Sequence, residues 1–288
     1  MNARSHLLEG EAAAARFALA VPRHGPMNRT GAAMGMRAGS SLEFRDYRGY
    51  EPGDDLRHID WNAYGRTDQL NVKLFREEVS PHLDVLIDGS RSMALADTAK
   101  ASATLALAGF FTSAAANAGF SHAGWLLAGD GIPLGDYRRR PAAWEGIAFD
   151  VPASPVHALA VTAARLRPRS VRVLLSDLLW DADPERVVRH LADRAASAVI
   201  VQVLALFDAR PEINGHFRLL DCETNELREI QVDRAMLERY LGKLRKLQGQ
   251  WHDCCRAAGA VFVTVVAEEL LRDWKVDPLV AAGVLQVS

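Results

Sequence analysis

From residue 83 onward, short apolar runs alternate with segments of helix length, and this alternation constrains the fold most strongly. The runs Leu83–Asp88, Val171–Ser176 and Ala198–Leu206 are rich in Val, Ile and Leu, which is typical of strands buried on both faces of a parallel sheet. Segments such as Asp97–Asn117 and Arg234–Ala258 are long enough to be crossover helices. The sequence therefore predicts an α/β fold, Rossmann-like, with a mostly parallel sheet and helices on both faces.

The first 80 residues have a different texture. Ser5–Ala20 predicts a helix, Gly25–Ser40 a flexible linker, and Leu42–Gly65 a polar, turn-rich stretch. We therefore expect an N-terminal extension over residues 1–80 and one α/β domain over residues 81–288.

Bulk properties exclude several classes of function. The formal net charge of −2 gives no field that would recruit nucleic acid. The apolar segment Ala12–Val21 is interrupted by Arg16 and preceded by acidic residues, unlike a signal peptide. No uninterrupted apolar stretch reaches the roughly 18–20 residues of a membrane span. Three cysteines, two of them adjacent, do not form a disulfide framework, so we expect a cytoplasmic protein.

The strand ending at Asp88 is followed by the loop Asp88-Gly89-Ser90-Arg91-Ser92. Three hard oxygen ligands, Asp88, Ser90 and Ser92, then lie on one tight turn at the carboxyl end of a strand, where ligands collect in open α/β sheets. Such a set suits Mg²⁺ or Mn²⁺. It also leaves a coordination position for a carboxylate from another molecule, so the loop predicts metal-dependent protein recognition.

Two further loops could complete this metal site. Leu174-Leu175-Ser176-Asp177 is a second apolar strand that ends in a carboxylate, and the carboxyl ends of parallel strands meet at one edge of a sheet. Ser154 precedes a predicted helix between the two strands. Either residue could instead be a turn former or a helix cap.

The first loop and Asp177 resemble the metal-ion-dependent adhesion site of the von Willebrand factor A domain. In that family a first-loop Asp and two Ser, a second-loop Thr and a third-loop Asp hold Mg²⁺. The resemblance assigns Asp88, Ser90, Ser92 and Asp177 to this set. The second-loop Thr is not found in the sequence, and Ser154 is its best substitute.

A second motif lies in the extension: Glu43-Phe44-Arg45-Asp46-Tyr47-Arg48-x-Tyr50-x-Pro52-Gly53-Asp54-Asp55-x-Arg57-x-Ile59-Asp60-Trp61. With Arg66-Thr67 and Phe75–Glu78 after it, this motif resembles a bacterial family of von Willebrand factor A-like proteins of unassigned function. Their genes commonly lie beside MoxR-type AAA+ ATPases. The resemblance implies an adaptor or co-chaperone of such an ATPase, with a client protein that offers an Asp or Glu to the metal.

The role of this second motif is open between two interpretations. Its opposite charges could form a buried ion-pair network that fixes the extension onto the domain, with Trp61 and Tyr64 filling core. Alternatively, the motif could be a partner-docking surface. The candidate docking residues are Tyr47, Tyr50, Asp54, Asp55, Arg57, Asp60 and Trp61.

The alternative function is a Mg²⁺-dependent hydrolase that uses the strand-end carboxylates. The sequence gives it little support. Ser92 stands where a Gly-x-Ser-x-Gly elbow needs glycine, and Ser90 stands where an Asp-x-Asp phosphatase loop needs aspartate. His58 beside Asp60 is the most suggestive acid–base pair in the sequence. We therefore expect a binding protein and not an enzyme.

Overall fold

The computed structural model describes residues 2–20, 42–77, 81–136, 138–152, 154–222 and 226–287. The chain forms two compact units, Met27–Ser80 and the combination of Met1–Pro26 with Pro81–Ser288. This division differs from the predicted extension over residues 1–80 in its first residues, which belong to the larger unit. The predicted linker Gly25–Ser40 lies outside the described residues.

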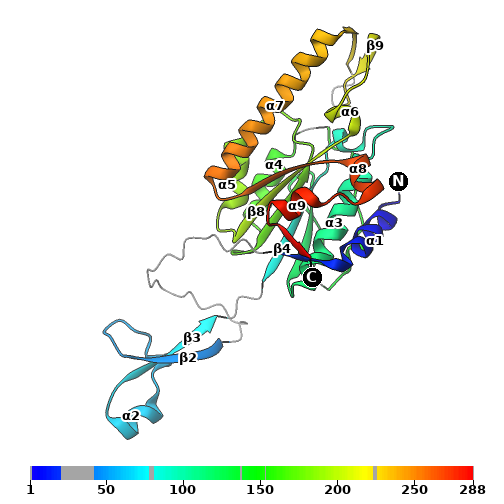
Figure 1. Cartoon of the computed structure of the whole chain (residues 1–288). Helices are drawn as coiled ribbons and strands as arrows, with labels where there is room; N and C mark the ends of the chain where they lie inside the picture. The colour runs from blue at the N-terminus through cyan, green and yellow to red at the C-terminus, as the bar shows by residue number, and fades with distance from the viewer. Residues whose placement is uncertain are drawn as a thin grey trace. The chain divides into compact units, whose positions relative to one another are not determined.

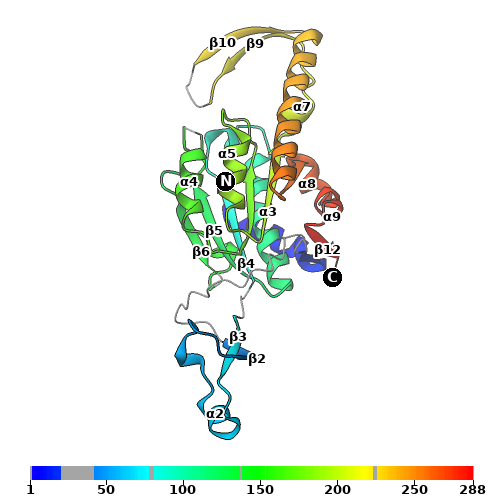
Figure 2. The same ribbon diagram turned by 90° about the vertical axis from the view of Figure 1, so that its left-hand side faces the viewer.

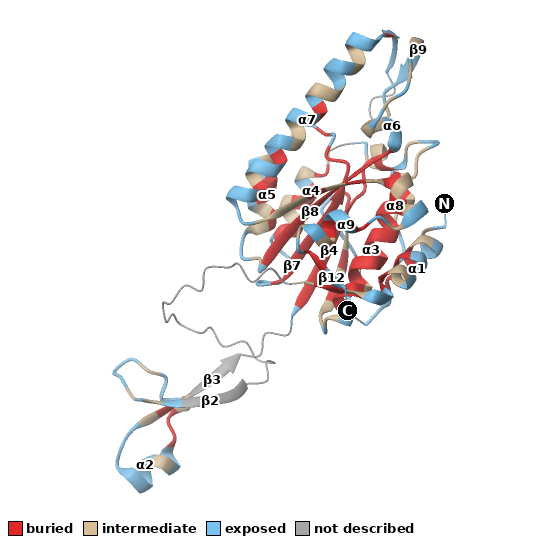
Figure 3. Cartoon of the chain, in the orientation of Figure 1, coloured by how far each residue is buried: buried red, intermediate tan, exposed pale blue. Residues whose placement is uncertain are grey.

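A six-stranded sheet forms the centre of the larger unit, in the order β11-β8-β7-β4-β5-β6. All neighbours are parallel except the hairpin pair β5 and β6. The strands are β4 (His82–Asp88), β5 (Ser121–Leu127), β6 (Ile132–Asp136), β7 (Val171–Ser176), β8 (Ser197–Leu204) and β11 (Val261–Val266). Every residue of β4, β7 and β8 is buried (Figure 3). The predicted mostly parallel sheet is confirmed.

Helices cover both faces of this sheet, as predicted (Figures 1 and 2). One face packs against α1 (Ala3–Ala13), α3 (Lys100–Asn117) and α8 (Ala267–Asp273). The other face packs against α4 (Val156–Ala163), α5 (Pro184–Ala192) and α7 (Arg234–Ala257). Each face has its own apolar core, since successive side chains of a strand point to opposite sides.

The pairing of β4 with β7 creates a topological switch point. The chain leaves β4 through α3 on one face, whereas it leaves β7 through α5 on the other face. Neighbouring loops that diverge in this way leave a crevice at the carboxyl ends of the two strands. Asp88 ends β4, and Asp177 directly follows β7.

The remaining elements lie at the margins of the larger unit. Strand β1 (Phe17–Leu19) pairs antiparallel with β12 (Leu285–Val287), which follows α9 (Asp277–Ala281). After β8 come α6 (Leu206–Ala209) and the hairpin of β9 (Gly215–Leu220) and β10 (Leu227–Val232). This hairpin lies at the end of α7 away from β11 (Figure 2). No helix in the described part of the chain has the length and apolarity needed to cross a bilayer.

The smaller unit contains an antiparallel pair and a short helix, where the sequence predicted mainly turns. Strand β2 (Leu42–Gly49) pairs with β3 (Asn71–Glu77), and α2 (Trp61–Thr67) lies in the connection. Asp60 begins α2 because its Oδ1 accepts hydrogen bonds from the N–H groups of Asn62 and Ala63. Ile59 and Val72 are buried and form an isolated backbone bridge.

Two glycines allow α1 to pack closely on α3. A Cβ atom on Gly10 would lie 1.8 Å from the carbonyl oxygen of Ala106, and one on Gly109 would lie 2.2 Å from that of Leu7. Both distances are too short for real atoms, so the backbones touch only because these side chains are absent. This contact holds the N-terminal helix in the larger unit.

We expect Gly109→Ala to lower the free energy of unfolding by about 1–3 kcal/mol, because the added methyl group forces α1 away from α3. Denaturant unfolding measures this change. Gly242→Ala in α7 is the matched control, since a Cβ there meets open space, and it should be neutral or stabilising by up to about 1 kcal/mol. Equal effects of the two substitutions would contradict the close contact.

Candidate functional site

Asp88 ends β4 at this switch point and is completely buried. Its Oδ2 accepts hydrogen bonds from the Ser176 hydroxyl at 2.6 Å and the Trp180 indole at 3.1 Å. Its Oδ1 accepts the backbone N–H of Ser90 at 2.9 Å. All three donors are uncharged, so this buried carboxylate is hydrogen bonded without an adjacent cation of its own.

The structure brings the other two residues of the first loop together. The hydroxyls of Ser90 and Ser92 share a hydrogen bond at 3.1 Å. The second loop runs alongside, because Val151 forms a parallel bridge with Ser90. Ser154 follows on this loop, and its hydroxyl accepts the N–H of Val156 at 3.4 Å. This hydrogen bond is typical of a turn-forming serine. A metal-ligand role for Ser154 stays a prediction.

Asp177 forms an ion pair with a cation that the sequence did not predict. The Lys100 ammonium lies 2.9 Å from Asp177 Oδ2 and 3.4 Å from Asp208 Oδ2. Lys100 and Asp177 are both fully buried. The other oxygen of Asp177 accepts the N–H of Leu179 at 3.1 Å. Both carboxylate oxygens of Asp177 are therefore engaged.

Helix α7 is connected to the crevice by polar side chains. The Tyr240 hydroxyl donates to the carbonyl oxygen of Asp208 at 2.9 Å. The Gln248 amide donates to Gln202 Oε1 at 3.0 Å, and Gln202 in turn donates to the carbonyl oxygen of Asp177. Two separate hydrogen-bonded paths therefore link α7 to the Asp177 loop.

The electrostatics reflect this dense packing of charges. Burial, followed by the negative charge of Asp177, raises the pKa of Asp88. Burial alone would lower the pKa of Lys100, but the charges of Asp177 and Asp208 outweigh it and raise that pKa. Burial and the same two carboxylates raise the pKa of Tyr240 to about 12. The crevice thus holds more negative than positive charge.

The first loop supplies the oxygen atoms that could hold a small divalent cation. Asp88 is a buried carboxylate with only neutral donors, and its neighbours Ser90 and Ser92 supply hydroxyl oxygens, which are ligands of the kind that Mg²⁺ and Mn²⁺ take. No group of three His, Cys, Asp or Glu side chains that could hold a metal occurs among the described residues. Hydroxyls would therefore form part of any ligand set in the crevice. Asp177 differs from the prediction in being bound to Lys100.

The smaller unit brings together most of the second motif. Arg48 pairs with Asp54 at 2.7 Å, Arg57 pairs with Asp55 at 2.6 Å, and Asp60 Oδ2 accepts the Tyr47 hydroxyl at 2.8 Å. Opposite-charge pairs therefore form inside this unit, but they are not the buried network of the first interpretation, since the Arg57 side chain is 72% exposed. The side-chain hydrogen bond from Arg57 is the largest cause that lowers the pKa of Asp55. The backbone N–H and the charge of Arg57 lower this pKa further.

The aromatic residues of this motif do not fill a core, contrary to prediction. Trp61 is 60% exposed and Tyr64 is 38% exposed, and their rings meet edge to face at 6.3 Å. Leu56, which precedes α2 in the chain, is 58% exposed. Large apolar side chains held together at a surface are typical of interaction sites.

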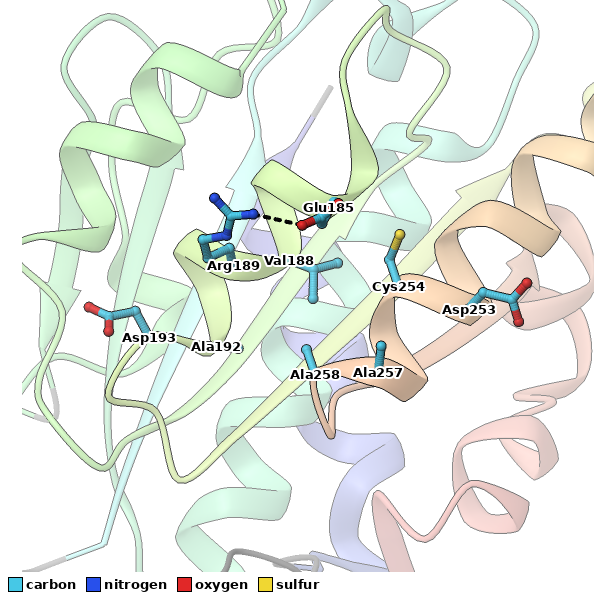
Figure 4. A pocket seen from close by; sticks show the side chains of 9 residues that line it. All are labelled: Glu185, Val188, Arg189, Ala192, Asp193, Asp253, Cys254, Ala257 and Ala258. Carbon is cyan, nitrogen blue, oxygen red and sulfur yellow. Dashed lines mark hydrogen bonds and ion pairs between the residues drawn. The ribbon is translucent and has the colours of Figure 1, made fainter.

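A separate groove of about 630 Å³ lies between α5 and α7 (Figure 4). It contains the ion pair of Glu185 with Arg189, and Cys254. Burial raises the pKa of the Cys254 thiol, so it is not an activated nucleophile. The cysteines are free thiols, as the sequence predicted.

Comparisons with known proteins identify relatives of unassigned function. A family model described as "Protein of unknown function DUF58" matches residues 46–249. The uncharacterized proteins Rv1480 of Mycobacterium tuberculosis and Mb1516 of Mycobacterium bovis are each 24% identical over 256 residues, 85% of this chain and 80% of theirs. None of these descriptions gives a catalytic activity.

Two solved structures were also matched. The conserved hypothetical protein BatB from Bacteroides thetaiotaomicron has a TM-score of 0.32 and 11% identity. An aerotolerance-related membrane protein from Bacteroides fragilis has a TM-score of 0.33 and 10% identity. Each match covers 67% of this chain and 96% of the other chain.

The charge of Asp60 should make the smaller unit sensitive to acid. The Tyr47 hydrogen bond, then backbone and Lys73 interactions, lower the Asp60 pKa to about 2, below the roughly 3.9 of an unfolded chain. The stabilisation is therefore complete above about pH 4 and is lost as the pH falls towards 2. We expect Asp60→Asn, which keeps a capping oxygen, to weaken this pH dependence.

The Trp61 indole signal in an NMR titration from pH 5 to about pH 2 measures this effect. Tyr47→Phe is the matched variant, because it keeps the Asp60 charge but removes its strongest stabilising hydrogen bond. The acid transition should then move to higher pH. An Asp60→Asn profile identical to that of the unchanged protein would contradict the assignment.

Proposed function

The chain belongs to the DUF58 family of proteins of unknown function, and we propose that it is a metal-dependent protein-recognition module. The crevice between β4 and β7 is its binding site, and a carboxylate of another protein is its target. The observation that carries this proposal is the buried Asp88 carboxylate, which has only neutral hydrogen-bond donors and lies beside the hydroxyls of Ser90 and Ser92.

Asp88, Ser90 and Ser92 are the residues proposed to hold Mg²⁺ or Mn²⁺. When bound, such an ion supplies a positive centre that attracts a carboxylate oxygen from a partner. Ser176 and Trp180 keep the Asp88 carboxylate oriented through Oδ2. Asp177 adds negative charge to the crevice, and Ser154 is the proposed contributor from the second loop.

This arrangement supports a fold of the von Willebrand factor A type. The support comes from three features: the mostly parallel sheet with helices on both faces, the Asp-x-Ser-x-Ser loop at its switch point, and Asp177 at the end of the neighbouring strand. The adhesion-site interpretation of the loop is part of the same proposal.

The proposed partner is a MoxR-type AAA+ ATPase, for which the chain acts as an adaptor or co-chaperone in the maturation or remodelling of a client protein. The sequence resemblance suggests the ATPase, and the two units offer separate surfaces. The crevice would take an Asp or Glu of the client. The exposed pair of Trp61 and Tyr64 would take an apolar surface of the ATPase. The proposed location is the cytoplasm.

The hydrolase alternative gains no support from the geometry. The side chains that contact Asp88 are Ser176 and Trp180, together with the backbone of Ser90, and none of these is an effective general base. His58, the candidate base of the sequence, belongs to the other unit. Recognition therefore explains the crevice better than catalysis.

We expect Asp88→Ala to abolish Mn²⁺ binding and the Mn²⁺-dependent part of client binding, because it removes the carboxylate proposed to hold the ion. Calorimetric titration of Mn²⁺ measures the first effect. Asp130→Ala is the control, since this exposed carboxylate follows β5 at the same edge of the sheet, and it should bind as the unchanged protein does. If Asp88→Ala binds the metal ion and the partner as the unchanged protein does, the metal proposal is wrong.

Trp61→Ala should weaken binding to the ATPase by at least about tenfold, as expected for an exposed aromatic anchor, without changing Mn²⁺ binding. Co-purification with a MoxR-type ATPase, followed by a titration that measures the affinity of the two proteins, tests this prediction. Leu220→Ala is the control, because Leu220 is equally exposed, at 60%, in the larger unit. Equal affinity of the Trp61→Ala variant and the unchanged protein would remove the smaller unit from the interface.

A further inference from the structure

Lys100 is an unusual residue for its position. It is the only charged residue of α3, a helix that is otherwise largely apolar, and its side chain is fully buried. Removing an ammonium group from water is costly unless it is paired. Lys100 satisfies this need by contacting Asp177 at 2.9 Å and Asp208 at 3.4 Å. These contacts lie in the crevice that also contains Asp88.

Asp177 is held in place from several directions. Lys100 engages its Oδ2, the N–H of Leu179 donates to its Oδ1, and Gln202 donates to its carbonyl oxygen. Its own backbone N–H donates to the sulfur of Met93 at 3.2 Å. If the Asp177 carboxylate turned towards another cation, it would break the shorter of the two ion pairs of a buried ammonium.

We propose that Lys100 acts as a tethered internal cation that withholds Asp177 from a divalent ion in the crevice. This inference rests on the proposed metal-binding function. The chain then offers an ion only one free carboxylate, that of Asp88, with the hydroxyls of Ser90 and Ser92. An ion with so few anionic ligands binds weakly by itself. A carboxylate from the partner supplies the missing charge, so ion and partner bind tightly only together.

The charge arrangement supports this division of the crevice. Asp88 receives only neutral donors, whereas Asp177 and Asp208 share the Lys100 ammonium. Asp177 and Asp208 therefore have a permanent cation beside them, and Asp88 does not. A divalent ion would be attracted to Asp88, the carboxylate without a cation.

The test is Mn²⁺ binding, measured by calorimetry and by the loss of the free-ion electron paramagnetic resonance signal. Lys100→Met removes the ammonium at similar length, and it should tighten Mn²⁺ binding roughly ten- to a hundredfold because Asp177 becomes available. Adding Asp177→Asn to Lys100→Met should cancel this gain. Of the two carboxylates that Lys100 pairs with, Lys100→Met with Asp208→Asn leaves only that of Asp177. This double variant should show the same gain, and it serves as the test if Lys100→Met alone does not fold.

The outcomes separate this inference from the proposed function. The inference is overturned if both Lys100 variants fold and neither binds Mn²⁺ more tightly than the unchanged protein does. It is also overturned if the gain in Mn²⁺ affinity of Lys100→Met persists when Asp177→Asn is added. Loss of metal-dependent partner binding in Asp88→Ala, with no effect of Lys100→Met, keeps the proposed function and rejects the inference. If Lys100→Met binds Mn²⁺ and the unchanged protein does not, the inference is supported. Recognition by the native chain then depends on more than the metal ion.

Discussion

The pairing of β4 with β7 is the interaction on which the rest of the structure depends. Because each strand sends the chain to a different face of the sheet, the two following loops separate and cannot cover each other. The polar groups at these strand ends lie in an otherwise apolar interior and must satisfy one another. The contacts of Ser176 and Trp180 with Asp88, and of Lys100 with Asp177, are the result.

Much of the fold was predictable because apolar runs of strand length leave few alternatives to a buried parallel sheet. The extent of β7 matches the predicted Val171–Ser176, and β4 ends at the predicted Asp88. The helix predicted over Ser5–Ala20 ends at Ala13. A 3-10 turn over Ala14–Arg16 follows and leads into β1, which pairs with β12 from the opposite end of the chain. Such a long-range partner leaves no local pattern. The helix α2 was missed because its start is set by the side chain of Asp60, within a run of turn residues.

The candidate site was predictable only in its first loop. Asp88, Ser90 and Ser92 carry a spacing that directs them to one turn, whereas the partners of Asp177 come from distant parts of the chain. Two signals could have found them: a single lysine in the apolar helix α3 and the glutamine in the apolar strand β8. A lone polar residue in a buried element needs a partner, and here both residues meet Asp177. The exposure of Trp61 could not be predicted, because aromatic residues fill cores more often than they remain at surfaces.

The hydrogen bonds of α7 have a consequence for how this helix is placed along the sheet. Its fully buried side chains are Leu244, Trp251 and Cys255, and apolar contacts alone tolerate small sliding movements, since they have little directionality. Tyr240 and Gln248 are less tolerant, because each must meet a fixed acceptor within hydrogen-bond distance. A shift of α7 by one residue would break both bonds at once. Polar geometry at the crevice therefore contributes, together with the apolar core, to the axial position of this helix and of the β9–β10 hairpin at its far end.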